Sequence, residues 1–314
     1  MKKLGIVMDP IQSIVFSKDS TLAMLLEASK QGYEIYYLEQ KDLFVEGGEA
    51  YGNSKTLKVY NDANHWFDFT AESKMKLGDL DVILMRKDPP FDLEFIYTTY
   101  ILELAEKSGV KVVNRPSSLR DFNEKFYISY FNNLTAKTLI AKEKTLIKAF
   151  HEKHKKIVLK PLDAMGGAEI FKLNYPDDNA EALIDAITHN GERTIMAQKY
   201  IPEIQEGDKR ILLIDGEPLP YLLLRIPAKG DWRGNLAKGA KAIAKPLSKN
   251  DINICAQIGP KLRENGILFA GIDVIGDFVT EINITSPTCI RELDTQCDMN
   301  ISEMIFSRLN VIAS

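Results

Sequence analysis

The chain has 314 residues, of which 45% are hydrophobic and 27% charged, the composition of an ordinary globular protein. Its formal net charge of -4, from 40 basic and 44 acidic residues, argues against a general nucleic-acid binder. No segment approaches the roughly 20 consecutive apolar residues that a membrane-spanning helix needs. Three widely spaced cysteines are typical of free thiols in a reducing compartment. We therefore expect a soluble, cytoplasmic protein with no membrane or nucleic-acid partner.

The first third of the chain alternates short apolar segments with amphipathic ones. In chain order the sequence predicts a strand over 3–8, a helix over 21–30 capped by Asp19 and Ser20, strands over 34–38 and 79–85, a helix over 95–107 and a strand over 109–114. Strands that alternate with helices of about ten residues indicate a parallel α/β layer. We therefore expect residues 1–122 to form an N-terminal α/β domain.

The rest of the chain is predicted to be α+β, in two parts. The middle part has a predicted helix over 119–130, strands over 157–160, 169–173 and 194–198, and a helix over 180–187. The last part is richer in strands, with apolar runs at 209–216, 218–227, 266–277 and 278–287. We expect a central domain over 123–202 and a C-terminal domain over 203–314.

A long polar interval, residues 228–245, separates two of the predicted C-terminal strands. It contains Arg233, Asn235, three glycines and four lysines. So long an interval inside a compact domain is usually a functional lid or a disordered insert. Because its composition is basic and rich in glycine, it suits a lid that closes over anionic phosphates. We expect residues 228–245 to be a mobile loop.

The segment GIDVIGDFVTEINITSP, residues 271–287, is predicted to form a hairpin that carries three oxygen-bearing side chains. With a two-residue turn at 276–277, Asp273 would lie opposite Thr280, and Glu281 would point to the other face. A connection of odd length instead places Asp273 opposite Glu281, with Asn283 two residues along on the same face. The two connections therefore predict different groupings of the oxygen atoms.

The aliphatic side chains favour the odd connection, because it also pairs Ile272 with Ile282 on the opposite face. Gly276 would then supply a left-handed or bulge conformation. Two converging carboxylates repel each other unless a cation lies between them, and hard oxygen ligands suit Mg²⁺. A solvated hairpin face is an equally good interpretation of this segment alone.

Other polar residues lie where predicted strands end. Lys160 ends the strand IVLK before Gly166 and Gly167, a pattern that can hold a phosphate. Those glycines are equally compatible with a plain hairpin turn, and Lys125 with a surface position on a helix. Residues 198–201 (QKYI) end another strand, where backbone atoms can recognise an adenine edge.

Two arginines also lie at strand ends. Arg210 begins RILLI and Arg225 ends LLLR. Charged residues at the ends of buried strands either face a site or extend their charge to water. The sequence alone does not choose between these positions.

Together these segments resemble the ATP-grasp superfamily and, within it, the bacterial glutathione synthetase family. The matching stretches are KLGIVMDP, LGDLDVILMRKDPPFD, SLRDFNEK, LKPLDAMGGA, GDKRILLIDGEP, RGNLA and TEINITSPTCIRE, in one order over nearly the whole chain. RKDPPFD and NITSPTCIRE are much more specific than the glycine turn. Two positions depart from the family pattern, namely the run KGAKAIAKP after RGNLA, where glycines are usual, and Ala164.

The resemblance implies an α/β fold, in which an N-terminal parallel α/β substrate domain precedes a two-domain α+β ATP-grasp module. It implies an ATP-dependent ligase that joins γ-glutamylcysteine to glycine through an acyl phosphate, with ATP between the central and C-terminal domains. The implied cofactor is Mg²⁺ or Mn²⁺, and the implied assembly is a homotetramer. Other ATP-grasp ligations, such as D-alanine–D-alanine ligation or glutamate addition to a protein tail, and a non-catalytic nucleotide-binding protein are the alternatives.

The resemblance also assigns roles by matching position. The implied metal ligands are Asp273, Glu281 and Asn283. The implied nucleotide contacts are Lys125, Lys160, Gly166, Gly167, Gln198, Lys199, Tyr200, Ile201 and Asp208. The implied catalytic residues are Arg210, Arg225, Arg233 and Asn235, and the implied substrate contacts are Arg86, Ser286, Pro287 and Thr288.

Overall fold

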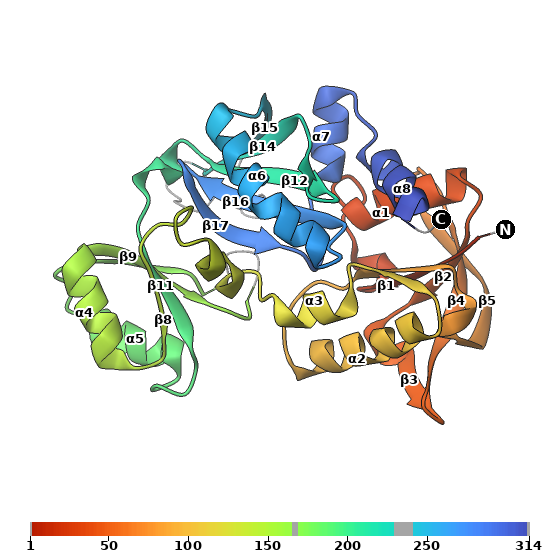
Figure 1. Ribbon diagram of the computed structural model, residues 1–314, viewed down its shortest axis with the longest axis horizontal. Helices are drawn as coiled ribbons and strands as arrows, with labels where there is room; N and C mark the ends of the chain where they lie inside the picture. Colours follow the sequence, from red (N-terminus) through yellow and green to blue (C-terminus); the bar gives the residue numbers. More distant parts are fainter. Residues whose placement is uncertain (1, 165–168, 229–240, 313–314) are drawn as a thin grey trace.

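The computed structural model describes residues 2–164, 169–228 and 241–312. Its three β-sheets follow one another along the longest axis of the molecule, with the four-stranded sheet on the left of Figure 1, the six-stranded sheet in the middle and the seven-stranded sheet on the right. The seven-stranded sheet belongs to the first third of the chain, the four-stranded sheet to the middle and the six-stranded sheet to the last third. Among the described residues, none of the helices has the length and apolar composition that a membrane span requires.

The seven-stranded sheet contains the strands predicted for the first domain. Its part of the chain comprises β1 (Lys3–Met8), α1 (Ser20–Lys30), β2 (Glu34–Leu38), β3 (Leu43–Glu46), β4 (Glu49–Val59), β5 (Phe67–Lys76), β6 (Val82–Arg86), α2 (Leu93–Lys107), β7 (Lys111–Val113) and α3 (Pro116–Asp121). Strands β2, β1, β6 and β7 are parallel neighbours, as predicted. The Leu22 N–H donates to the Asp19 carboxylate (2.6 Å), so the predicted cap of α1 is present.

Strands β3, β4 and β5 extend this sheet and are absent from the sequence-based prediction. Strand β4 pairs antiparallel with β2, β3 and β5, so a purely parallel sheet is wrong at this edge. Gly47 and Gly48 join β3 to β4 with φ values of 60° and 83°, the conformation of a tight hairpin turn. The two glycines were a usable signal, whereas β5 is largely polar and exposed and lacks the alternation that indicates a strand.

The four-stranded sheet is antiparallel, in the order β10-β9-β11-β8. Its part of the chain comprises β8 (Thr138–Ala141), α4 (Lys144–His154), β9 (Lys156–Pro161), β10 (Phe171–Asn174), α5 (Ala180–Thr188) and β11 (Ile195–Lys199). The predicted strands near 157, 169 and 194 and the helix near 180 correspond to β9, β10, β11 and α5. Ile147 of α4 and Ile184 of α5 are fully buried in the core beneath this sheet.

The helix predicted over 119–130 is interrupted. Helix α3 ends at Asp121, and a 3-10 helix over Phe126–Phe131 follows after four non-helical residues. The Asn123 side chain causes this break, because its Oδ1 accepts hydrogen bonds from the backbone N–H groups of Lys125 (3.2 Å) and Phe126 (2.9 Å). Such a local turn competes with helix formation.

The six-stranded sheet has the order β15-β14-β12-β16-β17, with β13 beside β12, and all its pairs are antiparallel. Its part of the chain comprises β12 (Asp208–Ile214), β13 (Glu217–Pro218), β14 (Tyr221–Ile226), β15 (Lys241–Pro246), α6 (Lys249–Glu264), β16 (Phe269–Ile275), β17 (Phe278–Asn283), α7 (Ile290–Cys297) and α8 (Ile301–Ile312). Helices α7 and α8 lie against α1, so the end of the chain packs on its beginning (Figure 1). Further 3-10 helices lie at Ile11–Ser13, Gln40–Asp42, Leu77–Asp79 and Pro202–Gln205.

Part of the polar interval 228–245 forms a strand. Residues 241–246 form β15 and pair with the whole of β14, from Tyr221 opposite Pro246 to Ile226 opposite Lys241. The predicted loop is therefore wrong for residues 241–245, because the short apolar run 242–244 lies between lysines and pairs with β14. Residues 229–240, including Arg233 and Asn235, lie outside the described residues.

Candidate active site

Strands β16 and β17 form the predicted hairpin with the predicted pairing at its open end. Asp273 lies opposite Glu281, and Ile272 lies opposite Ile282. The connection, however, is the two-residue turn at 276–277, with Ile275 opposite Phe278. The predicted odd connection is therefore wrong, although the register derived from it is right.

A β-bulge reconciles the short turn with this register. Val274 pairs with Val279 and Asp273 pairs with Glu281, so Thr280 is the extra residue on β17. The Thr280 Oγ1 donates to the Asp273 carbonyl oxygen (3.3 Å). Gly276 has the expected left-handed conformation, with φ of 58°. The bulge turns the Glu281 and Asn283 side chains back to the face that Asp273 occupies.

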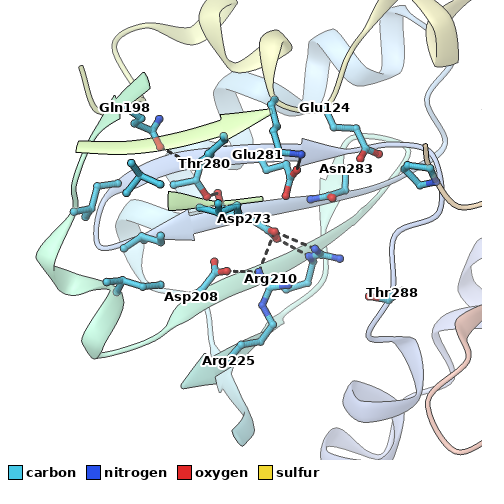
Figure 2. Close-up of a pocket in the computed structure, with 18 of the residues that line it drawn as sticks. Glu124, Gln198, Asp208, Arg210, Arg225, Asp273, Thr280, Glu281, Asn283 and Thr288 are labelled. Carbon is cyan, nitrogen blue, oxygen red and sulfur yellow. Dashed lines mark hydrogen bonds and ion pairs between the residues drawn. The ribbon is translucent and has the colours of Figure 1, made fainter. Parts of the chain in front are cut away.

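This face of the hairpin is one wall of a cavity of about 290 Å³ (Figure 2). The predicted site residues that line the cavity are Lys125, Lys160, Gln198, Lys199, Tyr200, Ile201, Asp208, Arg210, Arg225, Asp273, Glu281, Asn283, Ser286 and Thr288. The fold thus brings together residues that come from the four-stranded sheet, the six-stranded sheet and the segment that joins α3 to the middle of the chain.

Four charged residues of the six-stranded sheet form what we call the arginine wall, namely Asp208, Arg210, Arg225 and Asp273. Arg210 and Asp273 are neighbours on paired strands, and Arg210 donates to both carboxylate oxygens of Asp273, at 2.5 Å from Nε and 3.0 Å from Nη2. Arg225 Nη2 lies 2.9 Å from Asp273 Oδ2 and 2.5 Å from Asp208 Oδ2 (Figure 2). The two guanidinium groups therefore share one carboxylate.

Burial and these ion pairs act on the arginine wall in opposite directions. Burial alone would raise the pKa of Asp273, but Arg210 and Arg225 hold that pKa well below its usual range. Asp208 is hydrogen-bonded to Arg225, and burial raises its pKa to about 7 against the attraction of Arg225 and Arg210. Asp208 Oδ1 and Arg225 Nε are buried without a hydrogen-bond partner among the described residues. A polar ligand group at this point would satisfy them.

The facing surface is what we call the lysine wall, formed by Lys160 of β9 and Gln198 of β11. Lys160 Nζ donates to the neutral Gln198 side-chain oxygen (2.9 Å), and Gln198 Nε2 donates to Thr138 Oγ1 (3.1 Å). Burial lowers the pKa of Lys160 to about 8, and repulsion by Lys125 contributes to this shift. An anion bound beside Lys160 would favour its charged form.

Lys125 approaches the hairpin from a third direction. Its Nζ lies 2.9 Å from Glu281 Oε1 and also donates to the Ala164 carbonyl oxygen. Burial alone would lower the pKa of Lys125, but Glu281 raises it. Its ammonium group therefore stays charged at neutral pH and lies next to Glu281, one of the proposed metal ligands.

Apolar residues line the end of the cavity near Gln198. They are Val158, Ile170, Ile204 and Ile275, together with Tyr200 and Ile201. An apolar slot with these residues beside a polar strand end suits a flat heteroaromatic ring. The four aliphatic residues could not be predicted as lining residues, because a single apolar residue at a strand end has the same local pattern as a core residue.

Polar lining residues were also missed. Glu124 lies next to Lys125 in FNEK, Asp88 lies in RKDPP, and Thr280 and Thr285 lie in the hairpin and the segment after it. Burial raises the pKa of Asp88 and of Glu124, and repulsion by Glu281 adds to the shift of Glu124. The signal for both acids was their position inside matching stretches, because Asp88 lies in RKDPPFD, two residues after Arg86, and Glu124 lies in SLRDFNEK, next to Lys125.

Four predicted site residues, Gly166, Gly167, Arg233 and Asn235, lie outside the described residues. Two further ones, Arg86 and Pro287, lie behind the cavity wall. The buried Arg86 donates from Nη2 to the Pro287 carbonyl oxygen (2.9 Å) and from Nε to Thr21 Oγ1 (3.1 Å). Arg86 thus holds the turn that presents Ser286 and Thr288.

The donor set on the hairpin fits a magnesium or manganese ion shared with a phosphate-bearing ligand. Asp273, Glu281 and Asn283 offer two carboxylates and one amide oxygen, the hard ligands that these ions take. In the part of the chain that the structure describes, no group of three or more His, Cys, Asp or Glu side chains is arranged to hold a metal. An all-protein cage is therefore absent there, and phosphate oxygens would have to complete the coordination.

Comparison with known proteins identifies the family. The model of the prokaryotic glutathione synthetase N-terminal domain matches residues 2–120, and that of the prokaryotic glutathione synthetase ATP-grasp domain matches residues 124–298. The chain is 54% identical to a glutathione synthetase of Pseudomonas aeruginosa over 98% of this chain and 97% of that protein. It is 52% identical to a glutathione synthetase of Escherichia coli over 98% of each.

Solved structures with much lower identity share the fold. D-cycloserine synthetase DcsG superposes with a TM-score of 0.68 at 12% identity over 98% of this chain and 99% of that one. D-alanyl-alanine synthetase A from Vibrio cholerae gives a TM-score of 0.63 at 10% identity over 99% and 98%. The ATP-grasp fold implied by the resemblance is thus confirmed. By its sequence over nearly the full length, the chain belongs to the prokaryotic glutathione synthetase family.

Proposed function

We propose that this chain is an ATP-dependent ligase that joins γ-glutamylcysteine to glycine and forms glutathione, ADP and phosphate. Family membership over almost the whole chain, at 52–54% identity to curated glutathione synthetases, carries this conclusion. The arrangement of the cavity supports it, because four buried or nearly buried basic side chains meet three oxygen ligands there. Such a site suits a reaction between two negatively charged reactants.

The chemistry has two steps. The cysteinyl carboxylate attacks the γ-phosphorus, the bond from that phosphorus to the bridging oxygen breaks, and ADP leaves with the electron pair. The glycine amine then attacks the acyl carbon, loses a proton, and displaces phosphate. Both steps require alignment and charge neutralisation more than covalent help from the protein.

The nucleotide contacts are proposed from the two ends of the cavity. We assign the adenine ring to the apolar slot beside Gln198, Lys199, Tyr200 and Ile201. Asp208, with its unpartnered oxygen, is assigned to a ribose hydroxyl. Lys125 and Lys160, together with the backbone at Gly166 and Gly167, are assigned to the phosphates.

The remaining roles follow from charge and position. A Mg²⁺ or Mn²⁺ ion held by Asp273, Glu281 and Asn283 would neutralise phosphate charge when bound. Arg210 and Arg225 stabilise the charge that develops on the transferring phosphoryl group and on the acyl phosphate. Arg233 and Asn235 are assigned to a lid.

We assign the γ-glutamylcysteine contacts to the N-terminal domain and the turn after β17. Arg86 and Pro287 support that turn, and Ser286 and Thr288 face the cavity. The proposed domains are residues 1–122, 123–202 and 203–314, and the proposed assembly and location are a homotetramer in the cytoplasm.

The test is a coupled assay of ADP release by the purified chain with ATP, Mg²⁺ and γ-glutamylcysteine. We expect sustained ADP release only after glycine is added, with one glutathione formed per ADP. Turnover with D-alanine in place of both substrates would select a different ATP-grasp ligase. Nucleotide binding without turnover under any of these conditions would contradict catalysis.

A further inference from the structure

Residues 123–125 connect three parts of the cavity. Asn123 Nδ2 donates to the Leu162 carbonyl oxygen (2.9 Å) at the end of the four-stranded sheet. The Glu124 carbonyl oxygen accepts from the Ile282 N–H (2.9 Å) on the outer edge of β17. Lys125 pairs with Glu281, as described above. This tripeptide therefore lies against the hairpin that carries the proposed metal ligands.

The Glu124 side chain makes a denser set of contacts than its neighbours. One oxygen, Oε1, accepts three hydrogen bonds, from the Ile284 N–H (2.8 Å), the Thr285 N–H (2.9 Å) and Thr285 Oγ1 (2.8 Å). A carboxylate that accepts backbone N–H groups makes charge-assisted bonds, which are stronger than neutral ones. Figure 2 shows Glu124 in the same part of the pocket as Asn283.

The segment that Glu124 holds needs support from side chains. Strand β17 ends at Asn283, so the following residues are beyond the regular ladder of the sheet. Asn114 holds the same peptide from the other side, because its Nδ2 donates to the Ile284 carbonyl oxygen (2.7 Å). Asn114 is buried behind the cavity, whereas Glu124 lines it.

We propose that Glu124 is a positioning residue for the ligase reaction. Its carboxylate fixes residues 284–285, and this places Asn283 on one side and the turn with Ser286 and Thr288 on the other. The proposal rests on the proposed function for its effect on turnover. The adenine slot lies against β9, β11 and Ile275 at the turn end of the hairpin, whereas residues 284–285 follow its open end. Positioning by Glu124 should therefore affect turnover and the dipeptide more than ATP.

The test compares Glu124→Ala with Glu124→Gln, since the glutamine amide oxygen can still accept the three hydrogen bonds. For Glu124→Ala we expect kcat to fall by roughly 10-fold to 100-fold, as for small misplacements of reacting groups. We expect KM for γ-glutamylcysteine to rise while KM for ATP changes by less than about 3-fold. Glu124→Gln should recover most of the lost kcat. Glu94→Ala, on the exposed first turn of α2, is the matched control and should behave as wild type.

Hydrogen–deuterium exchange provides a readout that does not depend on activity. The Ile284 and Thr285 amides should exchange at least about 10-fold faster in Glu124→Ala than in wild type, and slowly again in Glu124→Gln. If Glu124→Ala does not fold, Glu124→Asp, whose carboxylate falls short of both amides, replaces it.

Wild-type kinetics in a folded Glu124→Ala variant would overturn the proposal. Equal losses in Glu124→Ala and Glu124→Gln would also overturn it, because charge rather than positioning would then be the cause. Failure of the wild-type chain to make glutathione would instead contradict the proposed function, and the exchange experiment would still test the contacts of Glu124.

Discussion

The arginine wall and the lysine wall face the same cavity, but their cationic side chains have different partners. In the arginine wall, Arg210 and Arg225 share the Asp273 carboxylate, so each cation already has an anionic partner inside the protein. In the lysine wall, the buried Lys160 ammonium donates to a neutral amide, and burial lowers its pKa to about 8. The first wall is stabilised by its own ion pairs, whereas the second gains most from an anionic ligand.

This difference separates two roles of charge in one site. Removing one member of a buried ion pair leaves the partners uncompensated, which is strongly destabilising. Removing a buried cation without an anionic partner relieves a desolvation cost. Substitutions in the arginine wall should therefore affect both fold stability and turnover, and those in the lysine wall mainly ligand affinity.

The largest effect is expected for Asp273→Asn in the arginine wall. The amide keeps the shape of the side chain but leaves Arg210 and Arg225 without their shared carboxylate and removes a proposed metal ligand. We expect kcat to fall by roughly 10²-fold to 10³-fold and the melting temperature to drop, with the fold retained by circular dichroism. Full magnesium-dependent activity in this variant would contradict the assignment.

A smaller effect is expected for Lys160→Met in the lysine wall. Methionine fills a similar volume without charge, so the ADP dissociation constant should rise by about 10-fold to 100-fold, the loss of one or two charge-assisted hydrogen bonds. The melting temperature without ligand should stay constant or increase, because a buried cation is removed. Calorimetric titration and thermal melts measure both quantities. If Lys160→Met lowered the melting temperature as far as Asp273→Asn does, the proposed difference in stability between the two walls would be contradicted.

The same lysine predicts a pH dependence of nucleotide binding. The pKa of Lys160 in the folded protein is lowered to about 8 from a usual value of 10.5, so this side chain loses its proton above pH 8. The charged groups that act on it are Lys125, which lowers its pKa, and Glu281, Asp208 and Asp273, which raise it. Phosphates favour the charged form, so ADP affinity should fall as pH rises from 8 to 9.5, by at most about 10-fold per pH unit.

Titrations in two buffers of different ionisation enthalpy would show proton uptake on binding above pH 8. Lys160→Met should abolish this uptake, and its persistence there would assign the proton to another group.

The linkage to stability has the opposite sign. The unfolded chain binds a proton at Lys160 between about pH 8 and 10.5 that the folded chain does not, so the contribution of this group to stability rises with pH across that window. Lys160→Met should remove this contribution, which denaturant titrations at pH 8 and pH 10 of both proteins would measure.

The smallest effect is expected for Gly276→Ala in the hairpin turn. Gly276 has φ of 58°, and an added Cβ would lie 3.2 Å from Glu203 Cβ and Cγ. The substitution should cost about 1 kcal/mol of folding free energy, measured by urea denaturation. Activity should change little, because the bulge at Thr280 and the aliphatic pairs maintain the register beyond the turn. A loss of activity comparable to that of Asp273→Asn would show that the turn controls the register.

The hairpin also shows what sequence reasoning can and cannot provide. The pairing of Asp273 with Glu281 was predictable, because burying Ile272 and Ile282 on one face leaves only that register. The way in which the chain connects the two strands was not predictable, since a two-residue turn with a bulge and a longer connection give the same pairing. A bulge has no strong sequence signature in a strand of β-branched residues.

Periodicity predicted much of the core fold and little of its edges. β1, β2 and the capped helix α1 follow from apolar runs and capping residues. The edge strands β5, which is largely polar, and β15, whose apolar run is only three residues long, are held by their neighbours. The same limit applies to the site. Most of the charged residues predicted at strand ends line the cavity. Glu124, in contrast, makes three hydrogen bonds to residues 160 and 161 positions away, and no local pattern indicates such contacts.

The most direct test of the proposed reaction follows an isotope through it. γ-Glutamylcysteine labelled with ¹⁸O in both oxygens of the cysteinyl carboxylate is incubated with the chain, ATP, Mg²⁺ and glycine, and the released phosphate is analysed by mass spectrometry. Attack of the carboxylate on the γ-phosphorus predicts one ¹⁸O in each phosphate and one in each glutathione amide. Unlabelled phosphate, released with or without glycine, would contradict the ligase reaction assigned to this cavity.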